Sequence, residues 1–121
     1  MKLALNCVVA STPSMTLLFH PAAREEARQA FLYLAEEDER LADDFEVRLA
    51  SAFASIQRRP ESYRVRRYKV RRKNLSRFKR HYVAYMIWND QIVVIAIGHA
   101  SRPPYYWYRR PKEYRQNHPE A

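Results

Sequence analysis

The chain of 121 residues contains a single glycine, Gly98, and a single cysteine, Cys7. Phosphate-binding loops of the G-x-G-x-x-G and G-x-x-x-x-G-K types each need at least two glycines, so both are excluded. A lone cysteine excludes an internal disulfide framework and a zinc site built on cysteines, and it suits a reducing compartment. No apolar run approaches the length that crosses a bilayer. We therefore expect a cytoplasmic protein that does not enter a membrane.

Positive charge, in contrast, is plentiful and unevenly distributed. The net charge is +9, from 22 lysines and arginines against 13 acidic residues. Residues 15–60 carry 6 basic and 9 acidic side chains, whereas residues 61–121 carry 15 basic and 4 acidic ones. Clustered positive charge attracts polyanions and acidic proteins. The second half of the chain is therefore expected to face phosphates or an acidic partner; an arginine-rich surface that serves only solubility is the alternative.

The length and an apolar content of 47% predict one globular domain with a single core. Residues 1–14 precede a second methionine, Met15, and hold an apolar run interrupted by Asn6. We interpret residues 1–14 as an N-terminal extension, such as an upstream start would add, and place the domain at residues 15–121. An added strand or interaction arm and a secretion signal are the alternatives.

The first half of the domain shows helical periodicity after a short strand at residues 16–20. Pro21 is suited to the first position of a helix that runs to about Glu37. A second apolar stripe begins at Leu41 and ends before Pro60. Asp38 is the expected N-cap of the second helix at a tight corner between the two. The sequence therefore predicts an αα-hairpin.

After Pro60 the period changes to alternation. Residues 81–88 and 91–97 flank Asn89-Asp90, which is typical of a β-hairpin because both turn residues tolerate positive φ. A preceding strand is expected where Tyr68 and Val70 alternate with basic residues. The alternation breaks between Leu75 and Phe78, which predicts a bulge or a bend. Together these elements predict an α+β domain of order β-α-α-β-β-β, followed by an aromatic and basic C-terminal tail.

The last strand leads into the block Gly98-His-Ala-Ser-Arg-Pro-Pro-Tyr-Tyr-Trp-Tyr-Arg-Arg110. The only glycine marks a place where the backbone bends or approaches another group closely. A histidine, three arginines and four aromatic rings follow within a dozen residues. Such a block at the end of a core strand is typical of a surface that recognises a nucleic acid or an acidic partner.

Four segments, in this order, resemble the RelE/ParE superfamily of type II toxin–antitoxin toxins. The first opens the first helix, the second follows the second helix, the third leads into the hairpin, and the fourth ends the last strand. They are Phe19-His-Pro-Ala-Ala23, Arg58-Arg-Pro-Glu-Ser-Tyr63, Arg71 to Phe78 with Tyr82-Val-Ala-Tyr85, and His99-Ala-Ser-Arg-Pro-Pro-Tyr-Tyr-Trp107. The similarity spans about residues 15–110 and is greatest to the ParE, or plasmid stabilisation, branch.

The resemblance implies a helical hairpin packed on a small antiparallel sheet. It also implies a cognate antitoxin that neutralises the protein in a hetero-oligomer. ParE-like toxins inhibit DNA gyrase by binding, and RelE-like toxins cut messenger RNA on the ribosome. Our first hypothesis is a ParE-like inhibitor; a ribosome-dependent mRNA endonuclease is the alternative, and a basic nucleic-acid-binding module without toxicity is the third.

An endonuclease without a metal would need a base, an acid and cations around the phosphate. His99 is the best proton carrier, with His81 or a tyrosine as a possible partner, and the catalytic candidates are His99, Arg102, Arg77 and Tyr105. The expected target-binding or nucleic-acid-binding residues are Arg67, Lys69, Arg71, Arg72, Arg77, Arg102, Trp107 and Arg109. Acidic residues are scattered over the basic half, so we expect no metal site and no cofactor.

Several of these residues have plainer interpretations. His99 can serve only to hydrogen-bond the backbone at a strand end, and Trp107 can fold back as a hydrophobic clasp over the sheet. Residues 64–73 are expected to form a basic strand face that contacts antitoxin, target or only water. Tyr82 and Tyr85 point to opposite faces of one strand, so we do not expect both in the core.

Overall fold

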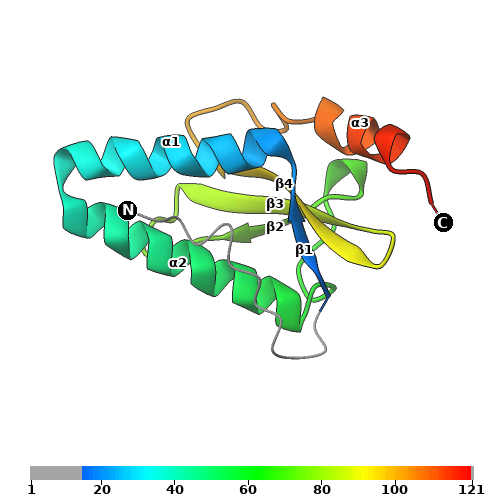
Figure 1. The fold of residues 1–121 in the computed structure, drawn as a ribbon, viewed down its shortest axis with the longest axis horizontal. Helices are drawn as coiled ribbons and strands as arrows, with labels where there is room; N and C mark the ends of the chain where they lie inside the picture. Colours follow the sequence, from blue (N-terminus) through cyan, green and yellow to red (C-terminus); the bar gives the residue numbers. More distant parts are fainter. Residues whose placement is uncertain (1–14, 121) are drawn as a thin grey trace.

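Four strands and three α-helices follow one another along residues 15–120, which the computed structural model describes (Figure 1). Their order confirms the predicted β-α-α-β-β-β arrangement, and the aromatic and basic tail contains a helix. The elements are β1 (Leu17–Phe19), α1 (Pro21–Glu37), α2 (Glu39–Arg58), β2 (Arg71–Asn74), β3 (His81–Trp88), β4 (Gln91–His99) and α3 (Arg109–Asn117). The proposed extension, residues 1–14, lies outside the described residues. No helix in residues 15–120 is long and apolar enough to span a bilayer.

A single residue, Asp38, joins α1 to α2. Its backbone N–H donates to the Leu34 carbonyl at the end of α1, and its side chain accepts a hydrogen bond from the Arg40 N–H at the start of α2. At the other end of α1, the His20 side chain caps the helix by accepting from the Ala22 N–H at 3.0 Å. Such caps satisfy helix donors that have no partner within the helix. The predicted αα-hairpin and its Asp38 cap are confirmed.

The sheet has the strand order β1-β4-β3-β2. β2, β3 and β4 are antiparallel neighbours, and both Asn89 and Asp90 in the β3–β4 turn have positive φ, as predicted. β1 pairs with β4 in parallel, so the prediction of a wholly antiparallel sheet is wrong for this strand. Alternation within a strand carries no information about its direction. The direction of β1 follows from the path of the chain through the two helices and three later strands.

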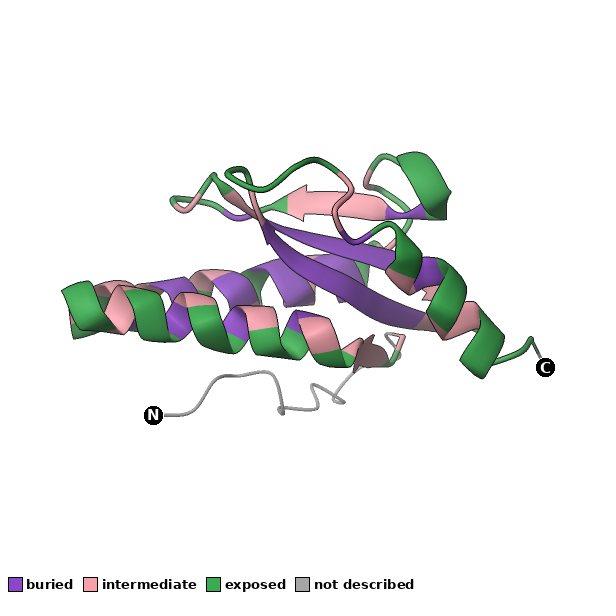
Figure 2. Ribbon diagram, turned by 90° about the horizontal axis from the view of Figure 1, so that it is seen from above, coloured by how far each residue is buried: buried purple, intermediate pink, exposed green. Residues whose placement is uncertain are grey.

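Both faces of the sheet are buried, and β3 and β4 are buried along most of their length (Figure 2). The face under α1 and α2 holds one cluster, which includes Phe45, Ile56 and Tyr85. The other face holds a second cluster around Tyr82, Met86 and Trp107. The expectation that Tyr82 and Tyr85 do not share the core is therefore wrong. They do point to opposite faces, but the C-terminal segment covers the second face and buries Tyr82 as well.

The connection between α2 and β2 differs from the expected strand. Residues 67–69 form a short 3₁₀ turn in which Tyr68 (φ 64°) and Lys69 (φ 59°) are left-handed, and β2 begins only at Arg71. The alternation of Tyr68 and Val70 with basic residues therefore does not reflect a strand with one buried face, because Val70 is buried and Tyr68 is exposed. The bend predicted between Leu75 and Phe78 is present, with Arg77 at φ 68°.

Candidate functional site

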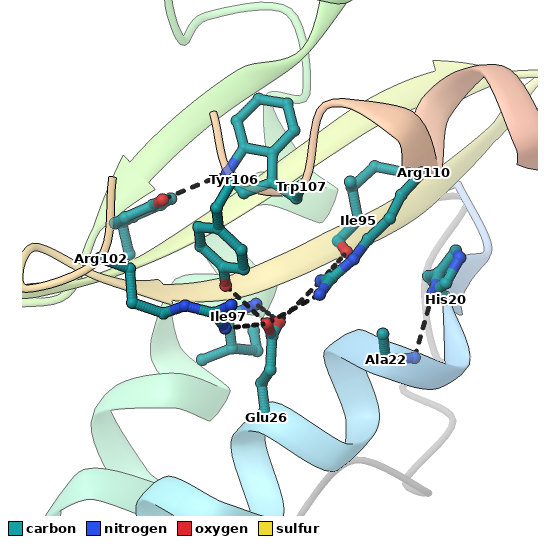
Figure 3. Close-up of polar contacts among 10 residues, drawn as sticks. His20, Ala22, Glu26, Ile95, Ile97, Arg102, Tyr106, Trp107 and Arg110 are labelled. Carbon is teal, nitrogen blue, oxygen red and sulfur yellow. Dashed lines mark hydrogen bonds and ion pairs between the residues drawn. The ribbon is translucent and has the colours of Figure 1, made fainter. Parts of the chain in front are cut away.

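A carboxylate on α1, that of Glu26, lies at the centre of a polar network where the chain leaves β4 (Figure 3). It accepts hydrogen bonds from Arg110 Nη1 and Nη2 at 2.9 and 3.0 Å and from the Tyr106 hydroxyl at 2.6 Å. Arg102 Nη1 lies 3.3 Å from it. The Glu26 and Arg110 side chains are largely buried. A buried charge is costly without partners, so these contacts tie the segment after β4 firmly to α1.

The Glu26 network also completes the hydrogen bonding of β4 beyond the end of β1, which pairs with β4 only as far as Val94. Farther along, the Ile97 N–H donates to Glu26 Oε1 at 3.1 Å, and the Ile95 carbonyl accepts from Arg110 Nη1 at 3.1 Å. Buried backbone groups at a strand edge need partners. Two side chains supply them here in place of a neighbouring strand.

Tyr106 and Arg102 form the outer part of the network. Burial, and after it the hydrogen bond to Glu26, raises the pKa of Tyr106, so its hydroxyl remains a donor. The Arg102 guanidinium lies over the Tyr106 ring, 3.6 Å from its centroid. This cation–π contact and the ion pair to Glu26 hold Arg102 in one position at the surface. The prediction of a positioned Arg102 side chain agrees with this geometry.

Gly98 lies opposite Tyr82 in the β3–β4 register. A Cβ atom at Gly98 would come within 2.1 Å of Tyr82 Cζ, so the tyrosine ring crosses directly over the glycine backbone. The Tyr82 hydroxyl then accepts a hydrogen bond from Trp107 Nε1 at 3.2 Å. Trp107 is only 3% exposed and belongs to the second core cluster. Trp107 is therefore the hydrophobic clasp, and its ring is not part of the surface that a partner meets.

Two histidines face each other at the end of the β3–β4 hairpin. The ring centroids of His81 and His99 are 4.6 Å apart, and the His81 ring also packs on Phe45. Burial, and after it the charge of His99, lowers the pKa of His81 to about 4, so His81 is neutral at pH 7. His99 Nδ1 accepts the Ser101 N–H at 3.0 Å. A proton transfer by His99 would therefore go through Nε2.

Two of the predicted cationic residues hold the chain together. Arg77 forms a hydrogen-bonded ion pair with Asp44 on α2. Arg71 Nη1 donates to the carbonyls of Glu61 and Tyr63 at 2.9 and 2.7 Å and so fixes the segment between α2 and β2. These guanidinium groups already have internal partners, which reduces what they can offer to a phosphate.

The other predicted cationic residues belong to segments that meet the second face of the sheet. The Arg72 guanidinium lies 3.8 Å from the centroid of the Tyr82 ring, and that of Arg67 lies 5.6 Å from the centroid of Tyr105. The remaining two, Lys69 and Arg109, are exposed. Because Tyr105 packs at the second face and Arg77 pairs with α2 at the first, these two catalytic candidates lie on opposite faces of the sheet.

A family model for the ParE toxin of the type II toxin-antitoxin system, parDE, matches residues 17–104. The chain belongs to the ParE toxin family. The match covers both long helices, all four strands and Arg102, and it confirms the resemblance predicted from the four segments. No curated protein matches the chain.

As a ParE-family toxin, the chain is the toxin component of a type II toxin–antitoxin system, and the family implies an antitoxin partner. The match ends at Pro104, whereas Tyr106 and Arg110 follow it. The Glu26 network therefore joins the ParE domain to the segment that carries α3.

The sequence reasoning missed Glu26 and the approach of the two histidines in this ParE toxin. Glu26 follows Ala23 by three residues and precedes Ala30 by four, so it lies on the apolar stripe of α1. An acidic residue at such a position is the signal in the sequence that could have indicated a buried carboxylate. His81 and His99 become neighbours through the hairpin register, which the Asn89-Asp90 turn sets. Within residues 15–120, no group of three or more histidine, cysteine or acidic side chains could hold a metal ion.

Proposed function

We propose that this ParE-family toxin acts in the cytoplasm by binding and inhibiting DNA gyrase, without cleaving RNA, and that a cognate antitoxin neutralises it. The observation that carries the proposal is the family match over residues 17–104. Arg102 is the residue that we assign to target binding. It is 52% exposed, and its ion pair and its contact with Tyr106 hold it in place. A positioned arginine loses little conformational freedom when it binds a carboxylate or a phosphate.

The arrangement of the predicted catalytic residues also favours inhibition by binding. RNA cleavage without a metal needs proton-transfer groups and cations gathered around one phosphate. Arg77 is paired with Asp44 near α2, whereas Tyr105 lies at the second face of the sheet. This separation supports a binding protein over a nuclease of the RelE type.

A ribosome-dependent mRNA endonuclease is the second candidate, because His81 stands beside His99. The pair supplies two imidazoles for proton transfer. A pKa of about 4 nevertheless makes His81 a weak base at neutral pH, since proton transfer is most efficient when the pKa lies near the working pH. The pair therefore supports this candidate less strongly than the separation of Arg77 from Tyr105 opposes it.

One experiment separates the two candidates: gyrase supercoiling and RNA integrity in a ribosome-containing translation mixture are assayed with the same protein. We expect inhibition of supercoiling, weakened by about 10-fold in Arg102→Ala, and intact RNA. The matched control is Arg28→Ala, because Arg28 is also 52% exposed and also paired with a glutamate, Glu25. Specific RNA cuts that disappear in His99→Gln would reject inhibition by binding and establish the endonuclease.

A further inference from the structure

Two segments far apart in the sequence bring three tyrosines together at the second face of the sheet. Tyr68 comes from the 3₁₀ turn, light green in Figure 1, and Tyr105 and Tyr108 come from the segment before α3, orange in Figure 1. The Tyr68 ring centroid lies 6.1 Å from that of Tyr105 and 6.2 Å from that of Tyr108. Tyr68 and Tyr108 are 42% and 45% exposed. The surface formed by Tyr68, Tyr105 and Tyr108 is called the tyrosine platform below.

Two residues of the tyrosine platform have an unusual backbone conformation. Tyr68 has φ 64° and Tyr105 has φ 61°, in the left-handed region that bulky side chains rarely adopt. Such conformations persist only where surrounding contacts fix them, and they occur preferentially at functional sites. The contacts here are the buried Trp107 ring, 6.3 Å from that of Tyr68, and Arg115 on α3, which donates to the Tyr68 carbonyl at 3.0 Å. The platform is therefore fixed before any partner arrives.

Two arginines beside the tyrosine platform contact its side chains and take no part in the salt bridges of the described residues. Each salt bridge within residues 15–120 involves one of Arg28, Arg40, Arg48, Arg77, Arg102 and Arg110. Arg67, by contrast, contacts the Tyr105 ring, and Arg109 donates to the Tyr108 hydroxyl at 2.9 Å. Neither makes a salt bridge with the carboxylates of the described residues. Arg67 and Arg109 thus place positive charge beside exposed aromatic rings without a direct ion pair in the described residues, and Glu113 interacts with Arg109 only at longer range.

We propose that the tyrosine platform binds single-stranded nucleic acid, with unpaired bases stacked on Tyr68 and Tyr108 and phosphates held by Arg67, Lys69 and Arg109. Aromatic rings interleaved with cations bind single strands, because each base has a face that can stack. A paired duplex hides those faces, and an acidic protein segment offers charge without a base to stack. This binding is separate from inhibition of gyrase and needs neither gyrase nor ribosome.

The test is fluorescence anisotropy of the full chain with a labelled 15-nucleotide oligothymidylate at about 50 mM salt, where phosphate contacts are strong. We expect Tyr108→Ala and Tyr68→Ala each to weaken binding by about 10-fold, and Tyr108→Phe to bind like the wild type because it keeps the ring. Tyr33→Ala is the matched control, since Tyr33 is an exposed tyrosine on α1, outside the platform. Thermal unfolding of each variant verifies the fold.

Three further ligands make the result decisive. A 15-base-pair duplex should bind at least 10-fold more weakly than the single strand, and polyglutamate should compete poorly. An oligouridylate of equal length tells DNA from RNA, and tighter binding of either agrees with the proposal. Equal binding of Tyr108→Ala and Tyr33→Ala, or a duplex bound as tightly as the single strand, would overturn it. Polyglutamate binding as tight as that of the oligonucleotide would instead identify a surface for an acidic protein.

Discussion

The carboxylate of Glu26 receives two hydrogen bonds from the guanidinium of Arg110, at 2.9 and 3.0 Å, although 84 residues separate the two in the sequence. Both side chains are largely buried, and Arg110 also donates to the β4 backbone at Ile95. The pair therefore fastens the C-terminal segment to both α1 and β4. That segment carries Trp107 and two residues of the tyrosine platform, Tyr105 and Tyr108, so this contact helps to position all three.

Replacing Glu26 by Gln should destabilise the protein by about 2–4 kcal/mol, because it leaves the Arg110 guanidinium buried without its counter-charge. The free energy of unfolding from urea titration measures the effect. Glu25→Gln is the matched control, since Glu25 sits next along α1 and pairs with Arg28 at the exposed surface. Exposed pairs contribute little, so Glu25→Gln should leave stability unchanged. Equal effects of the two substitutions would show that the Glu26 network does not hold the fold.

Replacing Gly98 by Ala should cost about 1–3 kcal/mol, because the new Cβ would collide with the buried Tyr82 ring. A double-mutant cycle tests this cause. In a Tyr82→Leu background, which removes the ring, the cost of Gly98→Ala should fall well below its value in the wild type. A cost that is the same in both backgrounds would place the strain elsewhere.

The protein should lose stability as the pH falls from about 6.5 to about 4. The pKa of His81 is lowered to about 4 in the fold, so in this range the unfolded chain binds a proton at His81 that the folded chain does not. Burial, and after it the charge of Arg110, lowers the pKa of His20 as well and adds to the same trend. His81→Gln should therefore flatten part of the dependence of the thermal midpoint on pH. An unchanged slope in His81→Gln would contradict this account.

Association with the antitoxin should be fast at low salt and markedly slower at high salt. Residues 61–121 carry 15 basic and 4 acidic side chains, and such a surface steers an acidic partner during diffusion. Stopped-flow measurement of the association rate at several salt concentrations tests this. Rates that barely change would indicate recognition through apolar contacts on the helices and sheet.

Local features of the fold could be predicted from the sequence because their causes lie within a few residues. The Asp38 cap, the Asn89-Asp90 turn and the bend before Phe78 depend on the preferences of those residues for particular backbone angles. The helices follow from apolar residues at helical spacing, and Gly98 pointed to a close approach because no other residue lacks a side chain. The four segments that resemble ParE toxins are likewise contiguous stretches of sequence.

Only the tertiary structure determines which residues of different elements come into contact. The parallel pairing of β1 with β4, the burial of both Tyr82 and Tyr85, and the meeting of His81 with His99 depend on strand order and register. Two pairs of contacting residues are distant in the sequence: Glu26 with Arg110, and Tyr68 with Tyr108. Periodicity cannot predict such pairs, because it describes only which face of its own element a residue occupies. Contacts between elements arise when burial of apolar surface brings those faces together, and only then do charges and rings acquire their partners.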